Sequence, residues 1–481
     1  MTRPALHCPV LHWRVAGLRM KTGAFLLTVF CLALVSGCAS LPNVQDQLGH
    51  ELSRADPATR IVGPGGELPP KKSKAMIRRL EGQVEATELL QQQVQLMQSI
   101  SAAPLVAGNK VTLLIDGEAT YEAMFAAIEQ ARDHINFESY IVDDDEIGRQ
   151  FSDLLLRKQA EGVQVNLIYD SFGSITTMPG FFQRLREGGV LVLEFNPVNP
   201  GKLRAGKGWS LGDRDHRKLL VVDGAVAFAG GINVSSVYSG SSAARARRGE
   251  EEQPWRDTHL RIEGPAAAEF QRLFLDTWAR QKGPALPPRD YFPPVKPAGK
   301  TLVRVVGSLP GEENRHIFMM YMSAISHAKN SIYLTTPYFI PDCQMLKALT
   351  EATARGVDVK ILLPGRNDSK LAFYAGRHYY DRLLKSGVQL FEWRGGMLHA
   401  KTAVIDDVWS TVGSSNLDTQ SLLKNDEANA VVLGRDFADP MQAMFEKDLG
   451  ESDQIVLEEW RKRSFVNYFK EFFSNLLKHW L

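Results

Sequence analysis

The sequence predicts an α/β fold of two duplicated domains, each a mixed sheet flanked by helices and related to the other by a pseudo-two-fold axis. Two observations lead to this prediction. From residue 110 onward, apolar strand-like runs alternate with stretches of helical periodicity. The same succession returns about 190 residues later, a spacing too long for a solenoid repeat and typical of a duplicated domain.

The apolar runs give the elements of the first half in order. Asp143, Asp144 and Asp145 precede the second predicted helix, where negative charge suits the helix dipole, and Gly162 ends that helix. The pattern predicts strands at 111–115, 135–142 and 163–169, with helices at 121–131 and 146–160.

Matching segments locate the second half. The segment ARDHINFESYIVDDD in the first half corresponds to AKNSIYLTTPYFIPD in the second, so that Tyr140 matches Tyr338. A Pro-rich stretch at 284–300 has the composition of a linker. It sets the first domain at 106–283 and the second at 301–460.

Composition narrows the function classes. The chain has 481 residues, enough for two or more domains, and its 44% hydrophobic content is ordinary for a globular protein. Its formal net charge is +1, whereas proteins that follow a nucleic-acid backbone carry a clear basic excess, so we expect no nucleic-acid partner. Three of the four cysteines lie within the first 40 residues, which leaves Cys343 alone and argues against a thiolate metal cluster.

Residues 1–37 have the features of a bacterial secretion signal. The 12-residue apolar run Ala24–Val35 is too short to span a bilayer but suits a signal-peptide core, and Met20 is a better start for it than Met1. The run ends in Val-Ser-Gly-Cys, which resembles a lipobox in which Cys38 is lipidated. The alternative is a plain signal peptide with an incidental cysteine. We expect a protein lipid-anchored to a bacterial membrane and facing the periplasm, with the inner or outer membrane left open.

Two further segments bear on membrane contact. Residues 38–105 are predicted to be a tether and a helical segment, and five basic residues between 71 and 79 suit either anionic head groups or a solvated face. Residues 461–481 are predicted to form an amphipathic helix with an aromatic stripe. This stripe suits the surface of a bilayer, and the alternative is docking on the protein's own core.

Each half contains one copy of the same spaced set of polar residues, with the pattern H-x-K-x4-D-x6-G-[GS]-x-N. A single histidine is more often structural than catalytic, but two copies in register with an independent repeat leave little room for coincidence. The first copy consists of His216, Lys218, Asp223 and Asn233, and the second of His399, Lys401, Asp406, Ser414 and Asn416.

This duplicated HKD motif resembles the defining motif of the phospholipase D superfamily, and the resemblance covers about residues 110–460. The strings DHRKLLVVDG and LHAKTAVIDDVWSTVGSSNLDTQSLLKNDEAN are similar to those of bacterial cardiolipin synthases that lack N-terminal transmembrane helices. The resemblance implies the phospholipase D fold and a phosphatidyltransferase that uses no metal and no other cofactor. It also implies phospholipid partners, phosphatidylglycerol among them, and contact with a membrane surface.

The spacing of the motif suits chemistry on a phosphodiester. Alternate residues of a strand share a face, so His216 and Lys218 point the same way, as do His399 and Lys401. One imidazole then attacks phosphorus while the other moves protons. The lysines and the two motif asparagines are expected to stabilise the anionic transition state, with Ser414 as a further donor.

Two strands also open with carboxylates, DTHLRIEG at Asp257 and EANAVVLG at Glu427. By resemblance, these carboxylates orient the two histidines. Asp223 and Asp406 are expected to hold the strand and turn through salt bridges.

Family precedent makes His216 the nucleophile and His399 the general acid. The expected reaction passes a phosphatidyl group through His216 to the hydroxyl of a second phospholipid and releases glycerol. A hydrolytic phospholipase D or an endonuclease would use the same site, and a non-catalytic lipid-binding scaffold is a third possibility. Near-neutral charge counts against the nuclease, and two intact motifs count against the scaffold.

Overall fold

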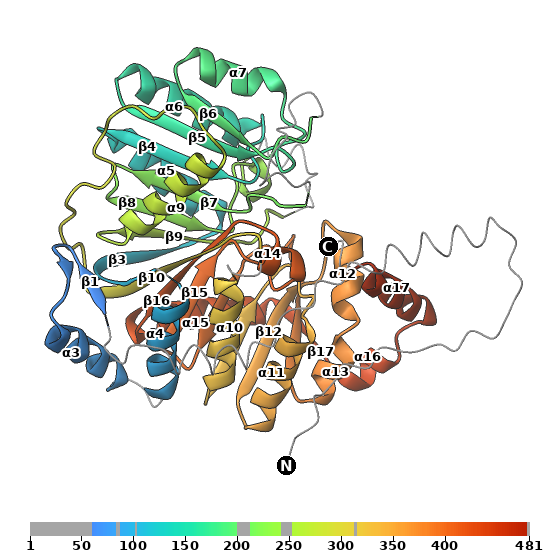
Figure 1. The fold of residues 1–481 in the computed structure, drawn as a ribbon. Helices are drawn as coiled ribbons and strands as arrows, with labels where there is room; N and C mark the ends of the chain where they lie inside the picture. Colours follow the sequence, from blue (N-terminus) through green and yellow to red (C-terminus); the bar gives the residue numbers. More distant parts are fainter. Residues whose placement is uncertain are drawn as a thin grey trace, which may run out of the picture.

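The computed structural model describes residues 60–82, 87–101, 103–199, 212–241, 253–311 and 315–478. The predicted signal peptide, Cys38 and most of the predicted tether lie outside these residues, as does the end of the chain after Lys478. Figure 1 shows two α/β domains, one above the other, joined by a chain segment without helix or strand. This segment includes the predicted linker at 284–300.

The first domain is a mixed sheet. Its strands are β3 (Leu105–Ile115), β4 (His134–Ser139), β5 (Gln164–Asp170), β6 (Leu191–Phe195), β7 (Lys218–Val222), β8 (Val226–Gly230) and β9 (Thr258–Glu263). Across the sheet they lie in the order β6-β5-β4-β7-β8-β9-β3, with β4, β5 and β6 parallel and the others antiparallel. One face is covered by α5 (Asp116–Gln130), α6 (Glu146–Ala160) and α7 (Pro179–Glu187), and the other by α9 (Ala267–Arg280).

The second domain repeats this plan. Its strands are β10 (Thr301–Ser308), β11 (Ser331–Thr335), β12 (Asp358–Pro364), β13 (Gln389–Trp393), β14 (Thr402–Ile405), β15 (Trp409–Gly413), β16 (Glu427–Leu433) and β17 (Ser452–Ile455). They lie in the order β17-β13-β12-β11-β14-β15-β16-β10. The helices are α10 (His316–His327), α11 (Cys343–Ala354), α12 (Lys370–Arg377), α13 (Tyr380–Lys385), α14 (Thr419–Leu423) and α15 (Arg435–Gly450).

The two sheets join at equivalent edges. β3 pairs antiparallel with β10, with Val106 opposite Val303, so equivalent strands meet at the centre of the molecule. A single buried core lies between α9 and α15 and contains Leu219 and Val221 of the first domain with Val404 and Val432 of the second. The predicted duplicated α/β fold is confirmed.

The segment before the first domain is packed more tightly than the sequence predicts. It forms β1 (Ile61–Gly63), β2 (Gly66–Glu67), α3 (Pro70–Glu81) and α4 (Thr87–Ile100). β1 pairs with β3, and Leu89 and Val94 of α4 are buried in the core of the second domain together with Phe318 of α10. Helices α3 and α4 lie within the segment 38–105, for which a tether and a helical segment are predicted, and from residue 61 onward apolar side chains attach this segment to the rest of the protein.

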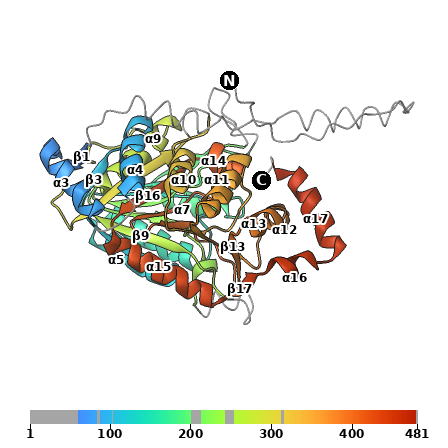
Figure 2. The same cartoon turned by 90° about the horizontal axis from the view of Figure 1, so that it is seen from below.

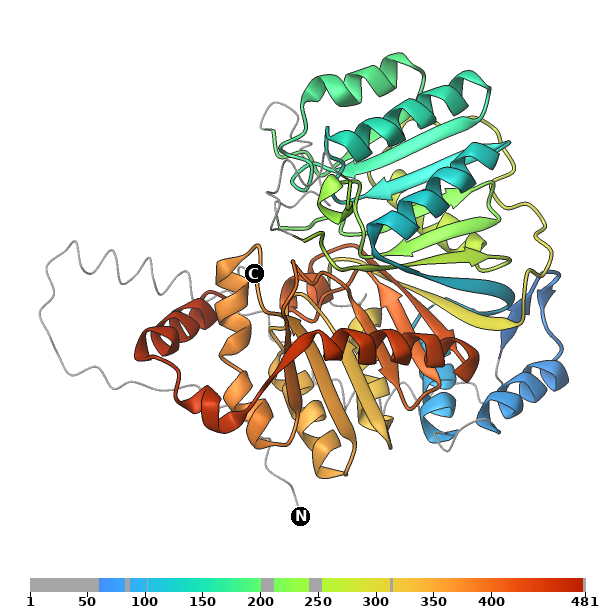
Figure 3. The same ribbon diagram turned by 180° about the vertical axis from the view of Figure 1, so that it is seen from behind.

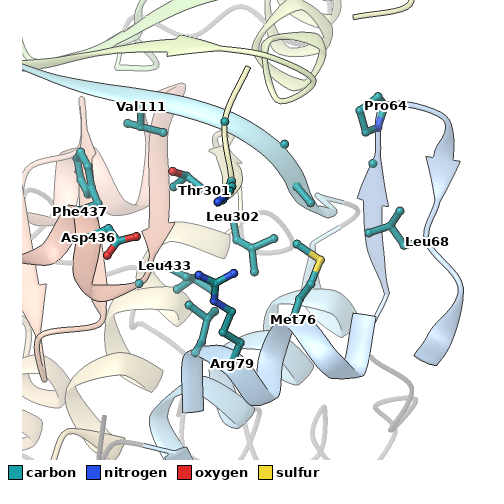
Figure 4. A pocket seen from close by; sticks show the side chains of 17 residues that line it. Pro64, Leu68, Met76, Arg79, Val111, Thr301, Leu302, Leu433, Asp436 and Phe437 are labelled. Atoms are coloured by element: carbon teal, nitrogen blue, oxygen red, sulfur yellow. The ribbon is translucent and has the colours of Figure 1, made fainter. Parts of the chain in front are cut away.

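A cavity of about 400 Å³ opens where this segment meets the seam between β3 and β10 (Figure 4). Leu68, Met76 and Leu302 give it an apolar lining, and Arg79 and Asp436 add charges of opposite sign. Among the described residues that line it, none belongs to the duplicated motif. The motif residues therefore form a separate site.

Asp223 and Asp406 hold the strands together through backbone hydrogen bonds rather than the predicted salt bridges. The Asp223 carboxylate accepts from the amides of residues 132, 133 and 134, at 2.8 to 3.0 Å. Asp406 accepts in the same way from residues 329, 330 and 331, at 2.7 to 3.0 Å. A strand rises about 3.3 Å per residue, so each carboxylate lies about 20 Å from the histidine of its own motif. Neither aspartate is part of the reacting centre, and both have a structural role, as the sequence led us to expect.

We expect Asp406→Ala to lower the free energy of unfolding by about 1–3 kcal/mol, because three amide donors, one of them buried, lose their acceptor. Asp406 also has a φ of 52°, which asparagine tolerates better than alanine, so Asp406→Asn should cost less. Urea unfolding monitored by circular dichroism measures both. A loss of specific activity in Asp406→Asn without loss of stability would contradict this structural role.

Candidate active site

Two short backbone bridges between the domains position the histidines. The His216 amide donates to the Asp426 carbonyl at 2.9 Å, in a parallel bridge next to β7. The equivalent bridge in the other half has the His399 amide donating to the Arg256 carbonyl at 2.7 Å. In each bridge, the residue that accepts the hydrogen bond is followed in the chain by a carboxylate, Glu427 after Asp426 and Asp257 after Arg256. Each motif histidine is therefore brought next to a carboxylate of the opposite domain.

The histidine–carboxylate pairs cross between the domains. His216 Nδ1 lies 3.0 Å from Glu427 Oε1, and His399 Nδ1 lies 2.7 Å from Asp257 Oδ2. The expectation that these two carboxylates orient the histidines agrees with this geometry, although the sequence did not indicate that each comes from the other half. A carboxylate at Nδ1 holds the proton there, which leaves the Nε2 lone pair for the substrate.

The two carboxylates are held in different ways. The Ser414 hydroxyl donates to Glu427 and accepts from the Ala428 amide at 3.0 Å. Ser414 is thus committed to Glu427 rather than being the expected donor to the transition state. At the equivalent position of the first motif, a Cβ on Gly231 would lie 2.2 Å from Asp257 Oδ1, so only glycine leaves room for this carboxylate.

The motif lysines lie beside the histidines, as the strand alternation predicts. Lys218 Nζ donates to the His216 carbonyl at 2.6 Å, and Lys401 Nζ donates to the His399 carbonyl. Burial lowers the pKa of Lys218 to about 7 and that of Lys401 to about 8. An ammonium has three donors, so each lysine can also donate to phosphoryl oxygens. A bound phosphodiester anion would in turn favour the charged form of both side chains.

The two motif asparagines differ. Asn233 accepts from the Ile141 amide at 3.1 Å and donates to the Tyr238 hydroxyl at 3.0 Å. Its side-chain amide is therefore engaged within the protein rather than with the substrate. The Tyr238 hydroxyl in turn lies 3.2 Å from His399 Nδ1. Asn416 Oδ1 is buried and has no hydrogen-bond partner in the described part of the chain. A direct role in stabilising the transition state thus stays a prediction for Asn416 and is replaced for Asn233.

Aromatic rings complete the site. The Tyr140 ring lies 5.0 Å from that of His216, and Lys218 Nζ lies 5.1 Å from the centre of the Tyr140 ring. On the other side, Trp255 and Tyr238 lie 5.2 and 5.9 Å from His399. Sequence reasoning did not assign a role to these three residues. The repeat that matches Tyr140 with Tyr338 was a usable signal, whereas Tyr238 and Trp255 have no aromatic counterpart at the equivalent positions of the second half.

Burial sets the charge state of the histidines. It lowers the pKa of His216 to about 4, against the opposing effect of Glu427, so this imidazole is neutral near pH 7. Burial and Lys401 lower the pKa of His399. Burial works to raise the pKa of Asp257 and Glu427, but the adjoining histidines and lysines outweigh it and leave both carboxylates ionised. The site therefore combines two anionic carboxylates and two lysines around two imidazoles, and a bound phosphodiester favours the charged form of the lysines.

Comparison with known proteins agrees with this geometry. The family model described as "Cardiolipin synthase, PLD-like domain" matches residues 124–241 and 321–449. The chain is 37% identical to cardiolipin synthase A of Pseudomonas entomophila over 76% of this chain and 74% of the relative. It is 35% identical to the cardiolipin synthase of Geobacillus kaustophilus over 79% and 74%. The chain belongs to the cardiolipin synthase family.

Membership of this family makes the protein a phosphatidyltransferase of the phospholipase D superfamily. A solved phosphatidylserine synthase of Haemophilus influenzae shares the fold, with a TM-score of 0.59 over 84% of this chain and 97% of that chain. The sequence identity of that pair is only 15%, so this likeness concerns the fold alone.

The crossed pairs predict that Glu427→Gln and Asp257→Asn impair different functions. Glu427→Gln should impair attack by His216, and Asp257→Asn should impair proton transfer by His399. We expect each to reduce turnover by about 10²–10⁴-fold, because the histidine loses the partner that fixes its tautomer. A phospholipid donor with an aryl leaving group needs no proton from a general acid. Formation of the phosphohistidine from this donor, followed by rapid quench, should recover in Asp257→Asn but stay slow in Glu427→Gln. Recovery in Glu427→Gln alone would exchange the roles of the two histidines.

Proposed function

We propose that the enzyme transfers a phosphatidyl group from one phosphatidylglycerol to the hydroxyl of a second, giving cardiolipin and glycerol. The observation that supports this most directly is the pair of crossed histidine–carboxylate contacts around two buried lysines, in a chain of the cardiolipin synthase family. The arrangement supplies a nucleophile, a proton carrier and positive charge for one phosphodiester.

In the first step, the Nε2 lone pair of His216 attacks phosphorus. A P–N bond forms and the P–O bond to the head-group glycerol breaks. His399 gives its proton to the departing oxygen, and Lys218 and Lys401 balance the charge that collects on the phosphoryl oxygens. The lowered pKa of His216 suits this role, because a neutral imidazole is the nucleophilic form. The substrate anion raises the pKa of His399 relative to the empty site, which favours the protonated form that the leaving group needs.

The second step reverses the roles. The hydroxyl of the acceptor lipid gives its proton to His399 and forms a new P–O bond as the P–N bond breaks. His216 is then free for another cycle, and Glu427 holds it in the same tautomer throughout. Water in place of the lipid hydroxyl would give phosphatidic acid, so the identity of the product depends on which acceptor reaches His399.

We expect the enzyme to convert phosphatidylglycerol vesicles into cardiolipin and glycerol, as measured by mass spectrometry of the lipids. His216→Ala and His399→Ala should each lose on the order of a hundredfold or more of this activity, since each removes a reacting group. His327→Ala, at the end of α10, is a matched control that should keep the activity of the parent. Phosphatidic acid without cardiolipin would show a hydrolase instead.

We further propose that the C-terminal helices bind the membrane surface. α17 (Phe465–Leu476) follows α16 (Leu457–Arg461) and lies against α12 at one end of the second domain (Figure 3). Its large apolar side chains point away from the protein, and Phe465, Phe469 and Phe472 are 82, 57 and 53% exposed. Across the described residues, no helix has the length and apolar character needed to cross a bilayer. A surface contact of this kind is the role that an outward apolar face supports.

The polar side of α17 faces the protein. Glu471 is buried and pairs with Arg463 at 2.9 Å, while the Arg463 guanidinium lies 4.1 Å from the Trp460 ring. Asn475 accepts from the Tyr379 hydroxyl at 2.9 Å. These contacts fix the rotation of the helix, so that the apolar stripe faces outward rather than docking on the core.

The first domain adds apolar side chains at the equivalent place. Phe172, Ile175 and Met178 lie in the segment that follows β5, and they are 52, 61 and 66% exposed. In the second domain, the segment after β12 leads into α12, against which α17 packs. Both domains therefore present apolar groups after equivalent strands, next to the end of the sheet where ligands of α/β proteins bind.

We also propose that Cys38 is lipidated and holds the enzyme on a bacterial membrane with the catalytic domains in the periplasm. Support for this proposal comes from the lipobox-like run alone, because Cys38 lies outside the described residues. The basic cluster of α3 lies at the opposite end of the molecule from α17 in Figures 1 and 2. It is therefore a separate element from the α17 surface.

With both Cys38 and α17 as anchors, binding to membranes should fall stepwise as each anchor is removed. Cys38→Ser should leave part of the full-length protein on anionic vesicles, held by α17. Adding Phe469→Asp and Phe472→Asp should lower the partition coefficient onto vesicles by about a hundredfold, because each phenylalanine buried in the bilayer contributes about 1.5–3 kcal/mol. Phe292→Asp, at a linker phenylalanine that is 44% exposed, is the matched control in the same Cys38→Ser background. Vesicle sedimentation measures all three, and equal binding of the double variant and the control would contradict the α17 surface.

A further inference from the structure

A second cavity, of about 270 Å³, adjoins the site on the His399 side. Trp255, whose ring lies 5.2 Å from that of His399, forms one wall, and Met397 lines it two residues before His399. Asp368 also lines the cavity and accepts a hydrogen bond from the Tyr338 hydroxyl at 2.5 Å. The Asp368 charge also acts to raise the pKa of Lys401. The cavity is therefore next to the reacting groups and on the side of the proton carrier.

Two arginines line this cavity, and they differ in what they contact. Arg394 is engaged, because it donates to the Ser452 carbonyl at 3.1 Å and pairs with Asp453 at 3.0 Å. Arg366 follows β12 at its carboxyl end, is exposed, and has no hydrogen bond or ion pair in the part of the chain that the structure describes. Its guanidinium is free to bind an anion.

The first domain has no such cation at the equivalent position. Counting from the matched glycines Gly162 and Gly356, Arg366 corresponds to Phe172. At this pair of equivalent positions, the cation is present on the His399 side and absent from the His216 side. In the proposed reaction, the His399 side receives first the leaving glycerol and then the acceptor hydroxyl.

We propose that this cavity is the acceptor subsite, in which Arg366 binds the phosphate of the second phosphatidylglycerol while its glycerol lies between Arg366 and His399. This inference rests on the proposed function. The acceptor has a free hydroxyl next to the attacking one, and Asp368 is placed to accept a hydrogen bond from it. A carboxylate accepts about four hydrogen bonds, and the Asp368 carboxylate accepts from Tyr338 and from the Ser369 amide.

The leaving glycerol and the acceptor glycerol occupy the same place, but they differ in charge. The glycerol that departs from the donor has no remaining phosphate, whereas the acceptor carries one. Arg366 therefore acts on the acceptor step and not on the donor step. Arginine suits this role because its planar fork binds a phosphate through two hydrogen bonds.

Two assays on vesicles of phosphatidylglycerol separate these steps. Exchange of labelled free glycerol into phosphatidylglycerol requires only the first step and its reverse. Cardiolipin formation requires the acceptor lipid as well. We expect Arg366→Ala to reduce cardiolipin formation by about tenfold or more, as for loss of a charged hydrogen bond, while glycerol exchange stays within about twofold. Arg366→Lys should recover part of the loss, since it restores the charge without the fork.

Arg435→Ala removes another half-exposed arginine, on α15, and should leave both assays unchanged. An equal fall of exchange and cardiolipin formation in Arg366→Ala would overturn the proposal, because Arg366 would then serve the donor or the fold. Unchanged cardiolipin formation would overturn it as well. A parent enzyme that exchanges glycerol but forms no cardiolipin would instead refute the proposed function, which keeps the two failures distinct.

Discussion

The two backbone bridges between the domains are the constraint on which the site depends. They bring His216 beside Glu427 and His399 beside Asp257, so neither domain contains a complete histidine–carboxylate pair by itself. A shift of one residue in either bridge would turn alternate side chains to the other face of the strand and separate the pair. Catalysis is therefore coupled to the packing of the domains against each other, and the pairing of β3 with β10 joins the two sheets at this junction.

Two ion pairs, one buried and one partly buried, fix which surfaces meet at this junction. Arg256 of the first domain pairs with Asp448 of α15 at 2.8 Å, and Asp426 of the second domain pairs with Arg280 of α9. Arg256 and Asp426 occupy equivalent positions, so the charges are exchanged between the halves. Pairing two copies of one half would place like charges together, and breaking a buried pair costs about 3–5 kcal/mol. The exchanged charges thus favour contact between the first and second domains over contact between two copies of one domain. Covalent linkage in one chain keeps these two unlike domains together.

The sequence was sufficient for the fold class and the motif lysines, because these depend on local alternation and on the repeat, and the family resemblance added the two orienting carboxylates. It did not indicate the crossing of the pairs, which depends on how two distant strands meet. Asn233 has the same motif position as Asn416, yet a neighbouring tyrosine, Tyr238, engages its amide. Periodicity also gave the apolar stripe of the last helix, but its outward direction depends on the buried Arg463–Glu471 pair.

The departures from two-fold symmetry have a chemical reason. In the proposed reaction the two substrate lipids are identical, yet one must give up its head group while the other must present a hydroxyl. A symmetric site would bind both in the same way and could not assign these tasks. Trp255 beside His399 is matched by Asn425 beside Glu427, and Arg366 is matched by Phe172. These differences give the two histidines unlike surroundings, as the proposed reaction of two identical lipids requires.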